Sequence, residues 1–161
     1  MAISLNDLKK YFDIYVKYCE ETKLFNDRKP NIPSGLTEGL ALFALNSCEQ
    51  KYKSAETGDI ISIHGNYRVE VKASSVGFDK KDCSSFGPNE RFDNLIFVDC
   101  DTNKKEIIVY DCHISYDKMQ ELQITKKQTF GDQCKEKRRP RFSIKEKLSP
   151  QMTVVQRYNF T

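Results

Sequence analysis

Residues 58–73 read GDIISIHGNYRVEVKA, and this stretch decides the fold of the chain. Apolar and polar residues alternate on both sides of His64-Gly65-Asn66, as they do in β-strands, and these three residues are typical of a tight turn. We therefore expect a β-hairpin whose strands are Asp59–Ile63 and Tyr67–Ala73.

Two helices are expected before the hairpin. From Leu5 to Leu24 apolar residues recur at steps of three and four, and Ser4 or Asn6 is a suitable N-cap. A second helix is expected from Gly35 to about Tyr52, after a proline-containing loop and with Ser34 as its N-cap.

Downstream of the hairpin we expect a polar loop, two strands, a short helix, a basic irregular segment and a last strand. The expected bounds are, in that order, Ser74–Asn89, Leu95–Val98 and Glu106–Tyr110, Ser115–Leu122, Ile124 onward, and Met152–Arg157. This order predicts an α/β domain with a central mixed β-sheet flanked by helices. A length of 161 residues fits a single domain, residues 1–161.

The composition, 39% hydrophobic and 30% charged, is that of a globular protein. The longest apolar run, Leu40–Leu45, is too short to cross a bilayer, and Met1–Asp7 does not resemble the start of a secretion signal. We therefore expect a cytoplasmic protein that makes no membrane contact. The six cysteines, at 19, 48, 83, 100, 112 and 134, are expected to be reduced, because no pair has the spacing of a zinc site and nothing indicates export.

The net charge of +3 is unevenly distributed. Residues 124–147 hold nine basic and three acidic residues, a charge of +6, which leaves −3 for the rest of the chain. Such a segment favours a polyanionic partner, although a solvated charged surface is the alternative. Its densest part contains Lys137, Arg138, Arg139 and Arg141, and arginine pairs bidentately with guanine in the major groove of DNA.

The hairpin brings together residues that can carry chemistry. Residues two apart in a strand share a face, so Glu70 and Lys72 point the same way while Val69 and Val71 point to the core. The hairpin also folds Asp59 back toward Glu70. Two carboxylates and one amine are then expected at one end of the sheet.

Two converging carboxylates repel each other unless a divalent cation lies between them. Mg²⁺, for which Mn²⁺ may substitute, is the natural occupant because it takes oxygen ligands, and the Val71 carbonyl is a further donor. Lys72 can hold or deprotonate a water, or balance charge on a phosphate. These groups suit hydrolysis of a phosphodiester bond, so Asp59, Glu70 and Lys72 are the predicted catalytic residues. The alternative is an ordinary turn aspartate followed by an exposed Glu-x-Lys triplet.

Asp59 followed by Glu70-Val71-Lys72 resembles the D…ExK signature of the PD-(D/E)xK nucleases, with Gly58 where proline often stands. Residues 84–88, 92–99 and 138–143 are similar to segments of small type II restriction endonucleases, and the resemblance covers roughly residues 35–144. It implies a restriction-endonuclease-like core, double-stranded DNA as substrate, a short palindromic site and 5′-phosphate ends. It also implies a homodimer and a cognate DNA methyltransferase in the same cell.

The resemblance adds further candidate residues. The family often carries a glutamate on the helix before the hairpin, a position that Glu38 fits and Glu49 fits less well. Glu38 is alternatively a capping partner of Ser34 or a solvated helix residue. The loop from Ser74 to Glu90, with Ser84 and Ser85, is a second candidate DNA contact because it leaves the sheet beside the site.

Two rival functions remain. The chain is alternatively another PD-(D/E)xK nuclease, such as a junction resolvase or a repair nuclease, which would recognise DNA structure rather than sequence. The second rival is a non-catalytic nucleic-acid-binding protein that uses only its basic segment. Discrete cuts in plain duplex DNA and a requirement for metal distinguish the three.

Overall fold

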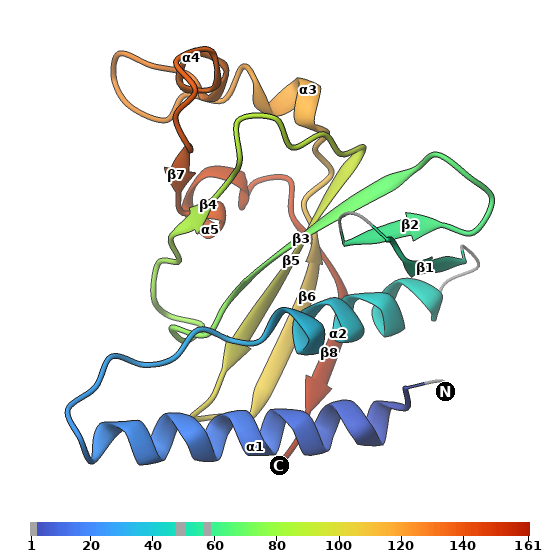
Figure 1. Cartoon of the computed structure of the whole chain (residues 1–161), viewed down its shortest axis with the longest axis vertical. Coiled ribbons are helices and arrows are strands. Elements are labelled where there is room, and N and C mark those ends of the chain that lie inside the picture. Colours follow the sequence, from blue (N-terminus) through green and yellow to red (C-terminus); the bar gives the residue numbers. More distant parts are fainter. Residues whose placement is uncertain (1–2, 48–50, 57–58) are drawn as a thin grey trace.

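A mixed six-stranded sheet forms the centre of the computed structural model, which describes residues 3–47, 51–56 and 59–161 (Figure 1). The strand order is β1-β2-β3-β5-β6-β8. Strands β3 and β5 pair in parallel, whereas the other neighbouring pairs are antiparallel, so the predicted mixed sheet is confirmed. The strands are β1 (Tyr52–Ser54), β2 (Ile60–Ser62), β3 (Arg68–Ser74), β5 (Asn94–Asp101), β6 (Glu106–Asp111) and β8 (Thr153–Asn159).

The predicted hairpin is confirmed. Strand β2 pairs antiparallel with β3, with Ile60 opposite Val69 and Ile61 opposite Arg68. Gly65 lies in the turn with a φ of 134°, a conformation that glycine adopts without steric cost. Strand β2 begins one residue later than expected, so Asp59 stands immediately before the strand.

Helix α1 (Leu5–Lys23) is confirmed almost to the residue. Ser4 is its N-cap, and the Ser4 and Asp7 side chains each accept a hydrogen bond from the other residue's backbone N–H. The helix buries one stripe, which comprises Leu8, Phe12, Tyr15, Val16 and Cys19.

The second helix is shorter than predicted. Helix α2 spans Ser34–Asn46, its N-cap is Pro33 rather than Ser34, and no side chain caps it. The prediction that it reaches Tyr52 is wrong, because Tyr52 begins β1. The Asn46 amide explains the early end: its oxygen accepts a hydrogen bond from the Tyr52 N–H at 2.8 Å, and its nitrogen donates to the Tyr52 carbonyl at 3.2 Å.

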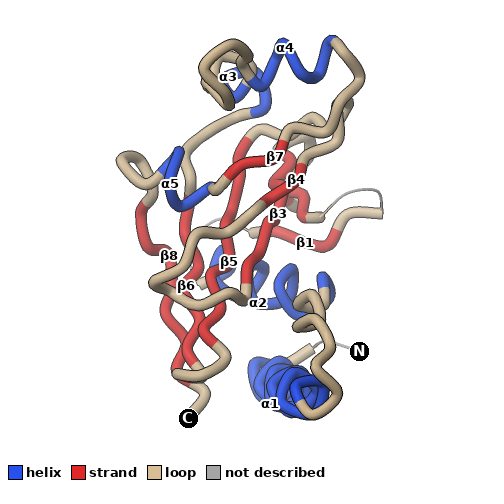
Figure 2. The backbone as a smooth tube through the Cα atoms, turned by 90° about the vertical axis from the view of Figure 1, so that its left-hand side faces the viewer, coloured by secondary structure: helices blue, strands red, loops and turns tan. Residues whose placement is uncertain are grey.

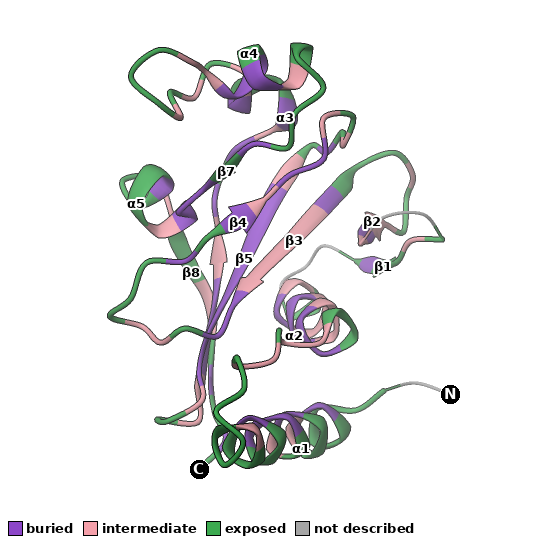
Figure 3. Ribbon diagram, turned by 60° about the vertical axis from the view of Figure 1, so that its left-hand side comes forward, coloured by how far each residue is buried: buried purple, intermediate pink, exposed green. Residues whose placement is uncertain are grey.

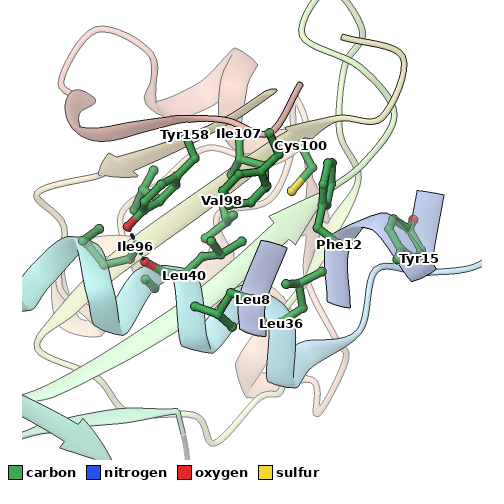
Figure 4. Packing of buried hydrophobic residues seen from close by; sticks show 14 of the residues in the cluster. Leu8, Phe12, Tyr15, Leu36, Leu40, Ile96, Val98, Cys100, Ile107 and Tyr158 are labelled. Carbon is green, nitrogen blue, oxygen red and sulfur yellow. Dashed lines mark hydrogen bonds between the residues drawn. The ribbon is translucent and has the colours of Figure 1, made fainter. Parts of the chain in front are cut away.

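The sheet separates two hydrophobic cores (Figures 2 and 3). The first core lies under α1 and α2, where Tyr158 of β8 donates a hydrogen bond to the Leu40 carbonyl at 3.3 Å (Figure 4). The second core lies on the opposite face and is rich in aromatic rings, with Phe86 and Phe142 stacked at a centroid distance of 5.4 Å. None of the described helices is long and apolar enough to span a bilayer.

The basic segment is ordered, so the prediction of an irregular chain after Ile124 is wrong. The predicted short helix is confirmed as α3 (Tyr116–Met119), and the chain then forms α4 (Phe130–Lys135), β7 (Arg141–Phe142) and α5 (Ile144–Leu148). Strand β7 pairs antiparallel with β4 (Ser84–Ser85) in a second, two-stranded sheet. The second core stabilises this segment by burying four of its apolar residues: Phe130, Phe142, Ile144 and Leu148. The many charged residues between them hide this apolar pattern in the sequence.

A buried aspartate fixes this segment to the rest of the molecule. Asp82 is 4% exposed and accepts hydrogen bonds from the Ser143 hydroxyl at 2.8 Å and from the backbone N–H groups of Ile144 and Lys145. Lys145 in turn forms an ion pair of 3.2 Å with buried Asp99 on β5. These contacts hold the basic segment in a defined position beside the sheet.

Candidate active site

Asp59 is fixed at the point where β2 begins. Its Oδ2 accepts a hydrogen bond of 2.6 Å from the backbone N–H of Val71 on β3. The pairing of β2 with β3 starts at Ile60, opposite Val69, and does not reach Val71. The Asp59 side chain therefore accepts the Val71 N–H in place of a backbone carbonyl of β2. The N–H and C=O of one residue leave a strand on the same side, so the Val71 carbonyl also faces this edge.

Glu70 and Lys72 lie on one face of β3, as predicted. Lys72 Nζ is 2.7 Å from Glu70 Oε1, and both side chains are largely buried. In the parallel β3–β5 pair Glu70 stands opposite Leu95 and Lys72 opposite Phe97, both members of the second core. Val69 and Val71 belong to the first core, so the predicted alternation is confirmed.

Glu38 contacts the Asp59 carboxylate from α2. Burial, followed by the negative charge of the neighbouring Asp59 carboxylate and its interaction with the Glu38 carboxyl group, raises the pKa of Glu38. Glu38 is partly buried, and it is not a capping partner of Ser34, since no side chain caps α2. Glu49 lies outside the described residues.

The structure adds Glu90 and Phe86, which the sequence analysis did not identify as site residues. Glu90 Oε2 lies 3.5 Å from Lys72 Nζ, and the same nitrogen lies 4.9 Å from the centroid of the Phe86 ring. Phe86 belongs to residues 84–88, here called the Ser-Phe-Gly-Pro segment, and Glu90 follows it closely in the chain. The sequence analysis noted this segment as similar to restriction endonucleases. It did not predict the contact with Lys72, because Phe86 is 14 residues further along the chain (86 − 72).

The site holds an excess of carboxylates. Burial raises the pKa of Glu70 to about 7; Lys72 opposes this rise, whereas the charges of Asp59 and Glu90 add to it. Glu90 Oε2 is a buried oxygen that accepts no hydrogen bond within the described residues. A group of carboxylates that burial and mutual repulsion destabilise is the electrostatic environment in which a cation binds.

A cavity of about 250 Å³ opens between these groups, and Asp59, Glu70 and Glu90 line it together with Arg68 and Arg91. The available donors are all oxygens, which suits Mg²⁺ or Mn²⁺. In the described residues no three acidic, histidine or cysteine side chains converge as a preformed metal site, and Glu70 is paired with Lys72. The residues therefore fit a cation in their chemistry, and binding requires Glu70 to leave Lys72.

The predicted DNA-contacting residues fall into two groups. Arg139 and Arg141 lie at the β4–β7 ribbon, where Arg139 Nε donates to the Ser85 hydroxyl at 3.4 Å and Arg141 pairs with Ser85. Arg138 lies outside the ribbon and contacts Gln128 and Glu136, and Lys137 is exposed in a left-handed turn with a φ of 58°.

Ser84 cannot offer its hydroxyl to DNA in this arrangement. Its side chain is buried and donates a hydrogen bond of 2.9 Å to Asp82. The sequence analysis placed it at a contact surface because the loop is polar, but the polarity of Ser84 serves the Asp82 anchor.

A groove of about 480 Å³ runs along β3 from Lys72. One wall is the loop 28–34, the floor is formed by β3 residues 71–74, and the other wall is residues 83–85. Arg28 is a basic residue of this wall that the sequence analysis did not consider. Its neighbour Lys29 is engaged internally, since it donates hydrogen bonds to the Ser75 carbonyl and to the Thr102 hydroxyl.

Comparison with protein families places the chain among the restriction endonucleases. Residues 3–150 match the Bsp6I restriction endonuclease family, and the chain belongs to this family. The type II restriction enzyme Bsp6I of Bacillus sp. (strain RFL6) is 33% identical over 119 residues, which cover 74% of this chain and 66%, just under two thirds, of that protein. No solved structure is a significant match.

Proposed function

We propose that the chain is a Mg²⁺-dependent type II restriction endonuclease that hydrolyses phosphodiester bonds of double-stranded DNA at a short specific site and leaves 5′-phosphate ends. One observation carries the proposal: in a chain of this family, Asp59 and Glu70 line one cavity, and Lys72 Nζ lies 2.7 Å from the Glu70 carboxylate. The same geometry supports membership of the PD-(D/E)xK superfamily and a restriction-endonuclease-like core.

Each residue has a defined part in the proposed reaction. Asp59 and Glu70, with the Val71 carbonyl and Glu38, would hold the cation. When bound, Mg²⁺ supplies positive charge that draws electrons from the scissile phosphate. Lys72 Nζ holds the attacking water in line or stabilises the negative charge that develops on the phosphate oxygens. The largely buried surroundings of Lys72 strengthen both interactions relative to water.

The groove along β3 and the β4–β7 ribbon support a path for the DNA. Arg28 lies on one wall of the groove, while Arg139 and Arg141 lie on the ribbon whose strand Ser84–Ser85 forms part of the other wall. A phosphodiester backbone in this groove passes Lys72, which lies at its floor. Basic side chains at such positions neutralise phosphates and make binding dependent on salt.

A homodimer belongs to the proposal, because one catalytic set cuts one strand and a two-fold symmetric protein matches a palindromic site. A companion DNA methyltransferase in the same cell, which would protect the host site, belongs to it as well. The cytoplasm stays the predicted location.

The test is to incubate the protein with unmethylated phage DNA and Mg²⁺ and to sequence the ends of the fragments. We expect discrete fragments whose 5′-phosphate ends share one short motif. A junction resolvase or repair nuclease would leave plain duplex uncut and cleave branched or damaged DNA. Retarded but uncut DNA would identify a non-catalytic binding protein. The variant Glu70→Gln is the control against a contaminating nuclease.

A further inference from the structure

Lys72 Nζ lies between two carboxylates and over one aromatic ring. Glu70 Oε1 is 2.7 Å away, Glu90 Oε2 is 3.5 Å away, and the Phe86 ring lies at 4.9 Å. Glu70 belongs to β3 itself, whereas Phe86 and Glu90 belong to the turn 86–90. The lysine is therefore held from two independent parts of the chain.

The turn is built to bring Glu90 to this position. The Glu90 N–H donates to the Gly87 carbonyl at 3.5 Å, so the chain folds back on itself at Gly87 and Pro88. A Cβ on Gly87 would lie 2.9 Å from Glu90 Oε1 and 3.2 Å from its Cδ. Gly87 therefore leaves the space that the Glu90 carboxylate occupies, and the φ of Gly87 is not one that excludes alanine.

The turn is also anchored to the body of the molecule. Phe86 is fully buried, stacks on Phe142, and its N–H donates to the Pro140 carbonyl at 3.0 Å. Ring stacking and a backbone hydrogen bond therefore join the turn to strand β7. A carboxylate mounted on a rigid support can hold a lysine in place at small entropic cost.

Glu70 carries two roles that compete with each other. It pairs with Lys72 in this structure, and under the proposed function it is a ligand of the divalent cation. A carboxylate that shares its charge with a divalent cation holds an ammonium group less strongly. Lys72 then needs a second anion if its nitrogen is to stay beside the cavity. Glu90 Oε2 can supply it, because this buried oxygen lies 3.5 Å from Lys72 Nζ and accepts no hydrogen bond within the described residues.

We propose that Glu90 is the residue that positions Lys72 during cleavage: the turn 86–90 presents its carboxylate to Lys72 Nζ and keeps the ammonium group beside the cavity when Glu70 binds the cation. Glu90 touches neither the substrate nor the cation in this role. The inference rests on the proposed function and explains why the Ser-Phe-Gly-Pro segment stands near the active site.

The test compares Glu90→Gln, Gly87→Ala and the double variant in single-turnover cleavage with Mg²⁺ at saturating DNA, and in duplex binding with Ca²⁺. We expect each single variant to cut about 10- to 100-fold more slowly, as is typical when a supporting carboxylate is lost, with binding unchanged. The double variant should be no slower than Glu90→Gln alone, because both changes remove the same contact. Glu20→Gln, on the exposed side of α1, is the matched charge control and should cut at the wild-type rate.

A second readout needs neither metal nor DNA. Urea unfolding of Glu90→Gln, Lys72→Met and the double variant forms a double-mutant cycle, and we expect the midpoint shift of Glu90→Gln to change when Lys72 is absent. Wild-type cleavage by Glu90→Gln, alongside an inactive Glu70→Gln, would overturn the inference and leave the proposed function standing. If the wild-type protein cuts no DNA, the proposed function fails, and only the double-mutant cycle then tests the contact between Glu90 and Lys72. Midpoint shifts of the two single variants that add exactly in the double variant would overturn that contact as well.

Discussion

The Asp59 carboxylate accepts a hydrogen bond of 2.6 Å from the backbone N–H of Val71, and so acts as the strand partner that β2 does not supply. The bond fixes one carboxylate oxygen relative to β3, the strand that carries Glu70 and Lys72. The geometry of the site therefore depends on a main-chain contact as well as on side chains, and substitutions of Asp59 can separate the two contributions.

Asp59→Asn and Asp59→Ala should differ in stability and agree in activity. Asparagine keeps an acceptor for the Val71 N–H, whereas alanine leaves that group without its partner, which typically lowers the free energy of unfolding by about 1–2 kcal/mol. Both variants lose the charge that would hold a cation, so we expect cleavage to fall by about 1000-fold or more. Urea unfolding and cleavage assays measure the two effects, and an Asp59→Asn variant that cuts at the wild-type rate would refute the assignment.

Lys72→Arg should be inactive while still binding DNA in Ca²⁺. The lysine occupies a small space bounded by Glu70, Glu90 and the Phe86 ring, and its side chain is only 18% exposed. A planar guanidinium group is larger and does not lose its proton, so it cannot replace a compact ammonium. Cleavage within about tenfold of wild type would show that only the positive charge matters at this position.

The hairpin, the proximity of Glu70 and Lys72, and the alternation of β3 could be predicted because they depend on local pattern. A period of two places Glu70 beside Lys72, and a tight turn around His64-Gly65-Asn66 returns the chain from β2 to β3. The end of α2 could not be predicted in this way. Residues 40–45 continue the helical pattern, and the helix ends because the Asn46 side chain pairs with the backbone of Tyr52, a contact that no local pattern indicates.

DNA contact by the basic segment is a prediction from its charge, whereas its regular secondary structure was not predicted. Its apolar residues, Phe130, Phe142, Ile144 and Leu148, are separated by charged residues and show no clear period, yet all four are buried in the second core. Glu90 was missed for a related reason: its partner Lys72 is 18 residues away in sequence (90 − 72), and only the turn at Gly87 brings the two together.

Removal of divalent metal should abolish cleavage. Burial, and with it the repulsion between neighbouring carboxylates, raises the pKa of Glu38 and of Glu70, and the groups available to bind a cation are all oxygens. We expect EDTA to stop cleavage, Mg²⁺ or Mn²⁺ to restore it, and Ca²⁺ to support binding with little turnover. Cleavage that continues in excess chelator would contradict the whole assignment, and Glu70→Gln in the same assay controls for contaminating nucleases.

Asp99 should make stability depend on pH below neutrality. Burial raises its pKa to about 6 from an ordinary value of 3.8, although the ion pair with Lys145 opposes this rise. Folding then favours the protonated form, so this group's contribution to stability falls as pH rises from about 4 to 6. The loss amounts to at most about 3 kcal/mol for a shift of this size.

The measurement for Asp99 is the free energy of unfolding of wild type and of Asp99→Asn across this pH range. Asparagine does not titrate, so the wild-type value should fall relative to that of the variant between pH 4 and 6 and run parallel to it above pH 7. Asp82 and Asp101 also face Asp99, and both remain in the variant, so the comparison cancels their own titration to first order. A difference that does not change with pH would show that Asp99 titrates normally.

The last prediction concerns how the protein reads sequence. The Arg138 side chain contacts Gln128 and Glu136, whereas the Arg141 side chain is exposed and makes no hydrogen bond or ion pair within the described part of the chain. Arg141 also lies on β7, which the Asp82 anchor and the Phe86–Phe142 stack hold in place. We therefore expect Arg141 to be a base-reading arginine and Arg138 to contribute through phosphates alone.

The two roles separate in binding assays with specific and random duplexes in Ca²⁺ across a salt series. Loss of a bidentate contact to guanine costs about 1–3 kcal/mol at the correct site and little elsewhere, and we expect this of Arg141→Ala. Loss of a phosphate contact weakens binding to both duplexes alike and lowers the salt slope by about one unit, as expected of Arg138→Ala. Arg139→Ala tests the contribution of the β4–β7 ribbon itself, because the Arg139 side chain donates a hydrogen bond to Ser85 on β4. If Arg141→Ala loses affinity equally for both duplexes, the ribbon grips only the backbone, and the groove wall at Arg28 becomes the next candidate for reading the bases.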